Sequence, residues 1–280
     1  MTLCFDWKNR GTVLRFIHIT DTHIGPTPDY ALRGVNPYRA LADLVDQLNA
    51  LTFDVDFILH SGDIVDDFTE ESYRTARTLL EKLKRPVYYL PGNHDDAKAM
   101  QRALLDIKRP KARYDQVIRS GGVEIITLDS RGPLDPGGLL LPQQLQWLHE
   151  QCKPKGDPLV IALHHQPVHL DSYWLDQGGA SWEAGRFMVL KNHTEFLEAI
   201  KPARKRLRGV LFGHIHRAFQ VVEQGILFAS APSVAMQFYS WPDQQDPIIS
   251  EEPGGFNVVT VNEDGIIVRQ HYLKRQAISS

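Results

Sequence analysis

The strongest constraint on the fold is a set of short polar motifs, each of which follows directly on a short apolar run. The apolar runs read FIHIT, FILHS, VYYLP, LVIAL and VLF in chain order. The motifs after them are Asp21-Thr22-His23, Gly62-Asp63, Gly92-Asn93-His94-Asp95, His164-His165 and Gly213-His214-Ile215-His216. Short apolar runs bounded by glycine and polar residues are typical of buried strands. Because ligands gather at the carboxyl ends of strands in α/β sheets, we expect the motifs to converge on one crevice.

The order of strand-like and helical patterns predicts the fold class. Helical patterns cover residues 37–49, 69 or 70 to 84, 142–151 and 192–200, and strand-like runs alternate with them up to about residue 213. Such alternation predicts an α/β fold with parallel strands and outer helices. Two hairpins follow, over 219–230 and 256–272, with turns near Gln224-Gly225 and Asp264-Gly265. We therefore expect a single domain over residues 1–280, with the C-terminal hairpins (about 219–272) completing a second, more antiparallel sheet stacked on the first.

Composition argues against several classes of partner. The 280 residues carry 31 Lys and Arg against 34 Asp and Glu, a net charge of −3. This balance offers no general attraction to a nucleic-acid backbone or an anionic membrane, and no apolar run approaches the ~18 residues of a membrane span. The cysteines, Cys4 and Cys152, are too few for a disulfide framework, and residues 1–11 lack the apolar stretch of a signal peptide. We expect a cytoplasmic protein without nucleic-acid or membrane partners.

The motifs supply seven side chains that can bind metal. They are the carboxylates of Asp21 and Asp63, the amide oxygen of Asn93, and the imidazoles of His23, His164, His214 and His216. Nitrogen and oxygen donors without thiolate suit Mn, Fe or Zn and argue against an iron–sulfur or thiolate zinc site. Seven donors are too many for one tetrahedral ion. We therefore expect two ions that share a bridging carboxylate, an arrangement that can clamp a phosphate for in-line displacement.

The ordered set D-x-H, G-D-x-x-D, G-N-H-D, H-H and G-H-x-H resembles the calcineurin-like metallophosphoesterase superfamily. Each motif alone is weak, but in this order, from Asp21 to His216, the set is specific. The resemblance implies a four-layer αββα sandwich, with helices outside two stacked sheets. It also implies a division of the ligands: Asp21, His23 and His216 for one ion, Asn93, His164 and His214 for the other, and Asp63 as the bridge.

Within that superfamily the chain is most similar to bacterial class III cyclic nucleotide phosphodiesterases. The similarity lies in residues 19–23, 32–36, 90–95, 174–177 and 236–238. Pro91 and Asp95 stand where protein Ser/Thr phosphatases usually have Arg and Glu, which counts against a protein substrate. Gln166 departs from the usual His-His-Pro-Pro, although Pro167 is retained. The resemblance implies a small phosphodiester substrate and hydrolysis of 3′,5′-cyclic AMP to 5′-AMP.

The expected mechanism is direct attack on phosphorus by a hydroxide that bridges the two metals, without a covalent enzyme intermediate. Asn93 would steady the phosphate oxygens, and His94, oriented by Asp95, would donate a proton to the leaving oxygen. Two alternatives remain open. One is a glycerophosphodiesterase or broad-specificity phosphomonoesterase with the same site residues, and the other is a catalytically silent metal-binding scaffold that presents a surface to a partner.

The rest of the substrate would meet residues outside the metal ligands. Candidates are His165, Arg33, Asn36, Gln237 and Phe238. Four of the five also have a structural alternative: a local hydrogen bond for His165, a surface position for Arg33 and Asn36, and a place in the core for Phe238. The long segments 24–36, 170–190 and 241–255 are candidate lids, either within one chain or against a second subunit of a homo-oligomer.

Overall fold

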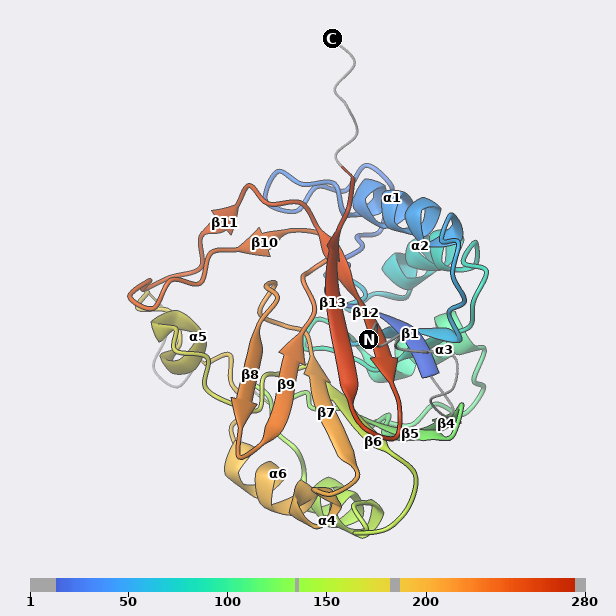
Figure 1. The fold of residues 1–280 in the computed structure, drawn as a ribbon. Helices are drawn as coiled ribbons and strands as arrows, with labels where there is room; N and C mark the ends of the chain where they lie inside the picture. The colour runs from blue at the N-terminus through green and yellow to red at the C-terminus, as the bar shows by residue number, and fades with distance from the viewer. Residues whose placement is uncertain (1–13, 134–135, 182–186, 275–280) are drawn as a thin grey trace, which may run out of the picture.

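Two β-sheets stack face to face, and helices cover the outer face of each sheet (Figure 1). The computed structural model describes residues 14–133, 136–181 and 187–274. This arrangement is the four-layer αββα sandwich expected from the sequence.

The first sheet has the strand order β13-β12-β1-β2-β3. Its strands are β1 (Leu14–Ile19), β2 (Phe57–His60), β3 (Val87–Tyr89), β12 (Gly255–Val261) and β13 (Ile266–Tyr272). β1, β2 and β3 are parallel neighbours, whereas β12 is antiparallel to both β1 and β13. One hydrophobic cluster joins this sheet to the helices on its outer face, α1 (Pro37–Asn49), α2 (Glu70–Leu80) and α3 (Ala97–Leu105).

The second sheet has the strand order β4-β5-β6-β7-β9-β8. Its strands are β4 (Gln116–Ser120), β5 (Val123–Leu128), β6 (Leu159–Leu163), β7 (Leu207–Phe212), β8 (Gln220–Glu223) and β9 (Ile226–Ser230). The four central strands are parallel, and the edge strands β4 and β8 pair antiparallel. α4 (Pro142–Gln151) and α6 (His193–Ile200) pack against it through a second cluster. Four short elements remain, α5 (Tyr173–Gln177), η2 (Lys201–Ala203), β10 (Gln237–Phe238) and β11 (Ile249–Ser250).

The inner faces of the two sheets share a third hydrophobic cluster. Phe16 and Phe57 of the first sheet are stacked, with ring centroids 4.9 Å apart, and they belong to the same cluster as Val160 and Leu211 of the second sheet. Each of these side chains is essentially buried, and full burial of a side chain of this size stabilises the fold by roughly 1.5–3 kcal/mol. This packing holds the carboxyl ends of strands from both sheets close together.

The two C-terminal hairpins do not complete one sheet, so the expectation that segment 219–272 finishes the second sheet is wrong in part. The β8–β9 hairpin does extend the second sheet, but the β12–β13 hairpin joins the first, where β12 lies between β1 and β13. All 7 residues of β12 are buried. A strand that is covered on both faces needs a central place in a sheet rather than an edge.

Local signals in the sequence determine where the helices begin. α1 has Pro37 in its first turn and Asn36 as its cap, whose Oδ1 accepts a hydrogen bond from the backbone N–H of Arg39 at 2.8 Å. Thr69 caps α2 in the same way, and the acidic first turn of that helix complements its dipole. In the described part of the chain, no helix is both long and apolar enough to cross a membrane.

Candidate active site

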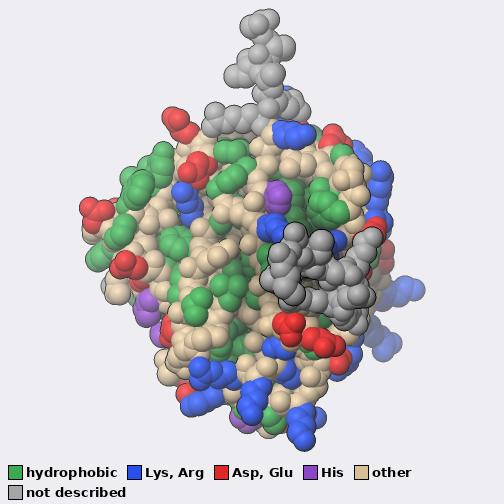
Figure 2. Space-filling model, viewed as in Figure 1, with side chains coloured by type: hydrophobic (Ala, Val, Ile, Leu, Met, Phe, Trp, Pro, Cys, Tyr) green, Lys and Arg blue, Asp and Glu red, His purple; other side chains and the backbone are tan. Residues whose placement is uncertain are grey.

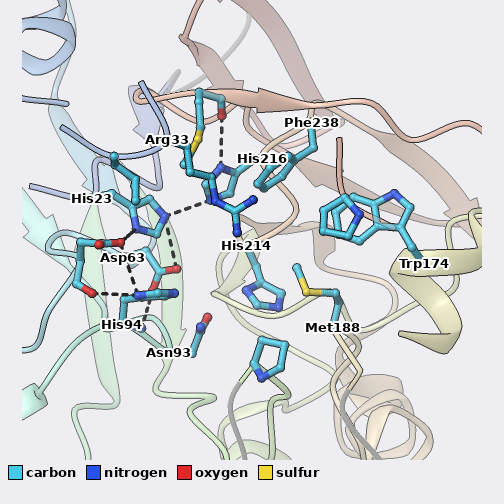
Figure 3. Close-up of a pocket in the computed structure, with 15 residues that line it drawn as sticks. His23, Arg33, Asp63, Asn93, His94, Trp174, Met188, His214, His216 and Phe238 are labelled. Carbon is cyan, nitrogen blue, oxygen red and sulfur yellow. Dashed lines mark hydrogen bonds and ion pairs between the residues drawn. The ribbon is translucent and has the colours of Figure 1, made fainter. Parts of the chain in front are cut away.

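The polar motifs come together at one edge of the sandwich, around a cavity of about 370 Å³ (Figure 3). β1, β2 and β3 of the first sheet lead into the motifs at Asp21, Asp63 and Asn93. β6 and β7 of the second sheet lead into those at His164 and His214. The site therefore lies across the carboxyl ends of strands from both sheets, and its geometry depends on how the sheets stack.

One group of potential metal ligands consists of Asp21, His23 and His216, in which one ligand atom of each lies within 4.8 Å of the others. The Nε2 atoms of His23 and His216 are 2.9 Å apart. Oδ1 of Asp21 lies 3.9 Å from Nε2 of His23 and 3.5 Å from Nε2 of His216. All three residues are buried. This is the set that the resemblance assigns to one ion.

A second group consists of Asp63, His164 and His214. Oδ2 of Asp63 is 3.2 Å from Nε2 of His164 and 3.7 Å from Nε2 of His23, so this carboxylate reaches both groups. Oδ1 of Asn93 lies 3.1 Å from Nε2 of His164. The structure thus gathers all seven candidate ligands and places Asp63 between the two groups.

Hydrogen bonds donated by Nδ1 orient three of the four imidazoles. Nδ1 of His23 donates to Oδ1 of Asp66 at 3.0 Å. Nδ1 of His164 donates to the backbone carbonyl of Ser61 at 2.8 Å. Nδ1 of His216 donates to the backbone carbonyl of Met236 at 3.1 Å. These acceptors hold a proton on Nδ1 and direct Nε2 of each ring toward the centre of the site. Metal-binding histidines in proteins are oriented in this manner.

Two buried ligand atoms have no hydrogen-bond partner among the described residues. They are Oδ1 of Asp21 and Nε2 of His214. A buried polar atom without a partner is costly, and a cation held by each group would satisfy the atom that belongs to that group. Imidazole, carboxylate and amide donors together suit Mn, Fe or Zn. These residues therefore fit a metal cofactor.

Burial and mutual charge determine the protonation of the site. Burial raises the pKa of Asp21. Burial also acts to raise the pKa of Asp63, but the charges of His164, His94 and His23 and a hydrogen bond from His164 together outweigh it and hold that pKa well below its usual range. Burial holds the pKa of His214 and that of His216 well below the usual value for histidine, so both rings are neutral. Neutral imidazole is the form that binds metal.

The backbone of the motifs is strained. Asp21, His23, Asp63, His214 and His216 all have left-handed backbone, with φ between 45° and 71°. Such residues cost of order 1–3 kcal/mol each and cluster at functional sites. Gly62, at φ +100°, permits the close approach of β2 to β6, because a Cβ there would lie 2.6 Å from Nδ1 of His164.

His94 is held by Asp66, which corrects the expectation that Asp95 orients it. Nδ1 of His94 donates to the carbonyl oxygen of Asp66 at 3.0 Å and lies 3.6 Å from Oδ1 of the same residue. The ring is edge-on to His23, with centroids 4.9 Å apart, and parallel to the ring of Phe68. His94 lines the cavity with its side chain 35% exposed.

Asp95 instead ties two motif loops together. Its carboxylate is buried and accepts hydrogen bonds from the backbone N–H groups of Ile64, Val65 and Gly92 and from the hydroxyl of Tyr73. These donors lie on the loops after β2 and β3 and on α2. Asp95 thus braces the backbone that presents Asp63 and Asn93, and it acts on the site through that backbone.

Two of the five residues predicted to contact substrate line the cavity, Arg33 and Phe238. Cζ of Arg33 lies 5.9 Å from the centroid of the Phe238 ring, and that ring stacks at 4.8 Å on the imidazole of His216 (Figure 3). Arg33 occupies the tip of a tight turn, in which Leu32 and Val35 exchange backbone hydrogen bonds. The turn places Arg33 in the wall of the cavity that candidate metal ligands also line.

The other three have structural partners and do not line the cavity. Asn36 caps α1. His165 is buried between the Ser130 hydroxyl and the Pro136 carbonyl, at 2.8 and 3.0 Å. The side chain of Gln237 donates to the carbonyl oxygen of Ser233. The local hydrogen bonds of His165 match its structural alternative, whereas the cap formed by Asn36 and the contact made by Gln237 had not been predicted.

Each candidate lid segment contributes to the cavity wall. Leu32 comes from segment 24–36, Trp174 and Met188 from 170–190, and Pro247 from 241–255, whereas residues 182–186 of the second segment lie outside the described residues. Backbone hydrogen bonds join α5 to the segment after β10. Hydrophobic side chains are exposed over the β10–β11 region, at the upper left of Figure 2, where Trp241 and Ile248 are 64% and 56% exposed. That these segments close over a substrate stays a prediction.

Adjoining His and carboxylate groups at the strand ends of an αββα sandwich are typical of metal-dependent phosphoesterases, and comparison with known proteins agrees. The family model described as calcineurin-like phosphoesterase matches residues 14–218. The chain belongs to that family.

Curated relatives and solved structures extend the match. A 3′,5′-cyclic-nucleotide phosphodiesterase of Nostoc sp. is 30% identical over 92% of this chain and 91% of its own length. The 3′,5′-cyclic adenosine monophosphate phosphodiesterase CpdA of Vibrio vulnificus is 29% identical over 92% of this chain and 89% of its own length. Among solved structures, a dimetal phosphatase from Danio rerio aligns with a TM-score of 0.60 at 15% identity, over 94% of this chain and 100% of that one. The structural match supports the fold.

We expect Asp95→Ala to destabilise the protein by several kcal/mol. The change would leave three buried backbone N–H groups without their acceptor and the Tyr73 hydroxyl with only the Asp96 carbonyl, at about 1–3 kcal/mol for each unsatisfied group. Urea unfolding followed by circular dichroism measures the loss. The neighbouring Asp96→Ala, which removes only the cap of α3, should cost about 1 kcal/mol. An Asp95→Ala protein of unchanged stability but low turnover would favour direct orientation of His94.

Proposed function

We propose that the protein is a dimetal cyclic nucleotide phosphodiesterase that hydrolyses 3′,5′-cyclic AMP to 5′-AMP. The observation that carries the proposal is the pair of adjoining ligand groups that share Asp63 beside a cavity of about 370 Å³, a size suited to a small ligand. The names of the Nostoc and Vibrio relatives point to the substrate. A net charge of −3 favours a small molecule over a nucleic acid.

The seven ligands divide between two ions. Asp21, His23 and His216 would hold one ion, Asn93, His164 and His214 the other, and Asp63 both. When bound, a metal pair of this kind supplies an acidified water as nucleophile and offsets charge on the phosphate oxygens. Mn, Fe or Zn matches the donors, and availability decides among them.

Asn93 and His94 act on the phosphodiester from the loop after β3. The Asn93 side chain lies beside Nε2 of His164, where its amide can donate to a phosphate oxygen as charge builds up on it. Nε2 of His94 donates a proton to the ribose 3′ oxygen as the bond from phosphorus to that oxygen breaks. The oxygen of water stays on phosphorus, so the product is 5′-AMP. A positioned acid of this kind contributes roughly 10²–10⁴-fold.

The nucleoside would lie toward the wall formed by Arg33, Trp174 and Met188. Trp174 is edge-on to Phe238, with centroids 5.7 Å apart, and both rings line the cavity. Apolar walls of this kind suit a base. The guanidinium of Arg33 supplies donors at the mouth, where they can meet acceptor atoms of the base or ribose.

We expect the Mn²⁺-reconstituted protein to convert cyclic AMP to 5′-AMP, resolved chromatographically, with a kcat/KM of at least ~10⁴ M⁻¹s⁻¹. Asn93→Ala should abolish the conversion because it removes both a ligand and a donor to phosphate. Cleavage of an aryl phosphodiester without turnover of cyclic AMP would mean that the substrate of the protein is a phosphodiester other than cyclic AMP. If neither substrate is hydrolysed although metal is bound, the result would support the alternative of a catalytically silent metal-binding scaffold.

We expect His94→Ala to lower turnover of cyclic AMP by roughly 10²-fold or more while the metal content stays near that of the wild type. The imidazole of His94 lies outside the seven candidate ligands, so its loss should spare the metals. Elemental analysis and steady-state kinetics on the same preparation make the comparison. Parallel losses of bound metal and activity would contradict the role of His94 as the acid.

A further inference from the structure

Asp66, the last residue of the G-D-x-x-D motif, connects the metal ligands to the candidate acid. Its Oδ1 accepts a hydrogen bond from Nδ1 of His23 at 3.0 Å and lies 3.6 Å from Nδ1 of His94. Its backbone carbonyl accepts the hydrogen bond from His94. The position of this one residue therefore affects both imidazoles, which stand side by side in the site (Figure 3).

The second oxygen of that carboxylate is held by Tyr30. The phenol hydroxyl of Tyr30 donates to Oδ2 of Asp66 at 2.6 Å. Burial, with help from Asp66, raises the pKa of Tyr30 to about 12, so the hydroxyl keeps its proton and remains a donor. With Oδ2 bound to Tyr30 and Oδ1 to His23, the carboxylate is held at both ends and cannot rotate freely.

The chain before Tyr30 is built to present this hydroxyl. Gly25 packs directly against the ring, and a Cβ there would lie 2.0 Å from Cγ of Tyr30. The Thr75 hydroxyl of α2 donates to the carbonyl oxygen of Pro26 at 2.7 Å, and the backbone N–H of Tyr30 donates to Thr27. These contacts anchor residues 25–30 to the first sheet's helices, so this part of the candidate lid serves as a support for the site.

We propose that Tyr30 is a positioning residue for proton transfer, which acts through Asp66 on the imidazole of His94. The inference rests on the proposed function, which makes His94 the acid. Tyr30 does not line the cavity, so its effect is indirect. When the hydroxyl is absent, Oδ2 loses its donor and Asp66 is held less firmly, so the imidazole that donates to the backbone carbonyl of Asp66 loses its alignment with the leaving oxygen. Small misplacements of a catalytic group carry large rate penalties.

Leaving-group dependence tests this role, since a poor leaving group needs a proton donor and a good one does not. We would compare wild type and Tyr30→Phe on two methyl aryl phosphodiesters, one with phenoxide and one with 4-nitrophenoxide as leaving group. Tyr30→Phe should lose roughly tenfold or more in kcat on the phenyl ester. On the 4-nitrophenyl ester it should lose less than about threefold, with wild-type metal content.

Two further variants sharpen the comparison. Gly25→Ala keeps the tyrosine but displaces its ring, so it should reproduce the loss on the phenyl ester. Tyr38→Phe is the matched control. It removes a tyrosine hydroxyl on α1 whose hydrogen-bond partner among the described residues is the Thr78 hydroxyl. In a His94→Ala background, Tyr30→Phe should add no further loss, as expected for residues that act as a unit.

Equal losses on both esters, or no loss on either, would overturn the inference. A drop in metal content with equal losses would mean that Tyr30 acts through His23 alone, and it would overturn the inference as well. Failure of the wild type to produce 5′-AMP would count against the proposed substrate, whereas the ratio of the two aryl esters would still decide the role of Tyr30. The two failures are therefore distinguishable.

Discussion

Two carboxylates, Asp21 and Asp63, are buried where the two sheets meet, and the rest of the site is arranged around their charge. Burial of an ionised carboxylate costs several kcal/mol unless other groups compensate it. The compensation here comes from distant parts of the chain. The backbone N–H of His214 donates to Asp21 at 3.0 Å and that of His94 to Asp63 at 2.8 Å. A fold that brings these loops together gathers negative charge and imidazoles in one place, which is what a pair of cations requires.

The supporting hydrogen bonds are as specific as the ligands. Asp95 joins the loops after β2 and β3, Asp66 links His23 to His94, and backbone carbonyls hold Nδ1 of His164 and His216. The strained backbone at the ligands persists because these bonds over-determine it. The two groups of candidate ligands and His94, the proposed acid, are thus parts of one hydrogen-bonded unit, so changes made beyond the candidate ligands should affect the chemistry.

Sequence alone predicted the strand-end motifs and the outline of the sandwich, because buried strands and their polar ends leave a strong local pattern. It predicted α1 and α4 with the observed bounds, since a proline in the first turn marks the start of each. It did not place β12 beside β1, because hairpins look alike until their neighbours are known. It missed β4, which is polar at both ends, and α3. It assigned the support of His94 to adjacent Asp95, whereas Asp66, brought near by the turn after β2, provides it. Contacts of that kind depend on how loops fold over one another, and spacing does not reveal them.

The central claim is that the two ligand groups hold a pair of metal ions that share Asp63. Anomalous diffraction from crystals grown with Mn²⁺ tests it most directly. We expect two peaks about 3.5–4 Å apart, one among Asp21, His23 and His216 and the other among Asn93, His164 and His214, with Asp63 in contact with both. A single peak, or a peak centred instead among His23, Asp66 and His94, would contradict the account.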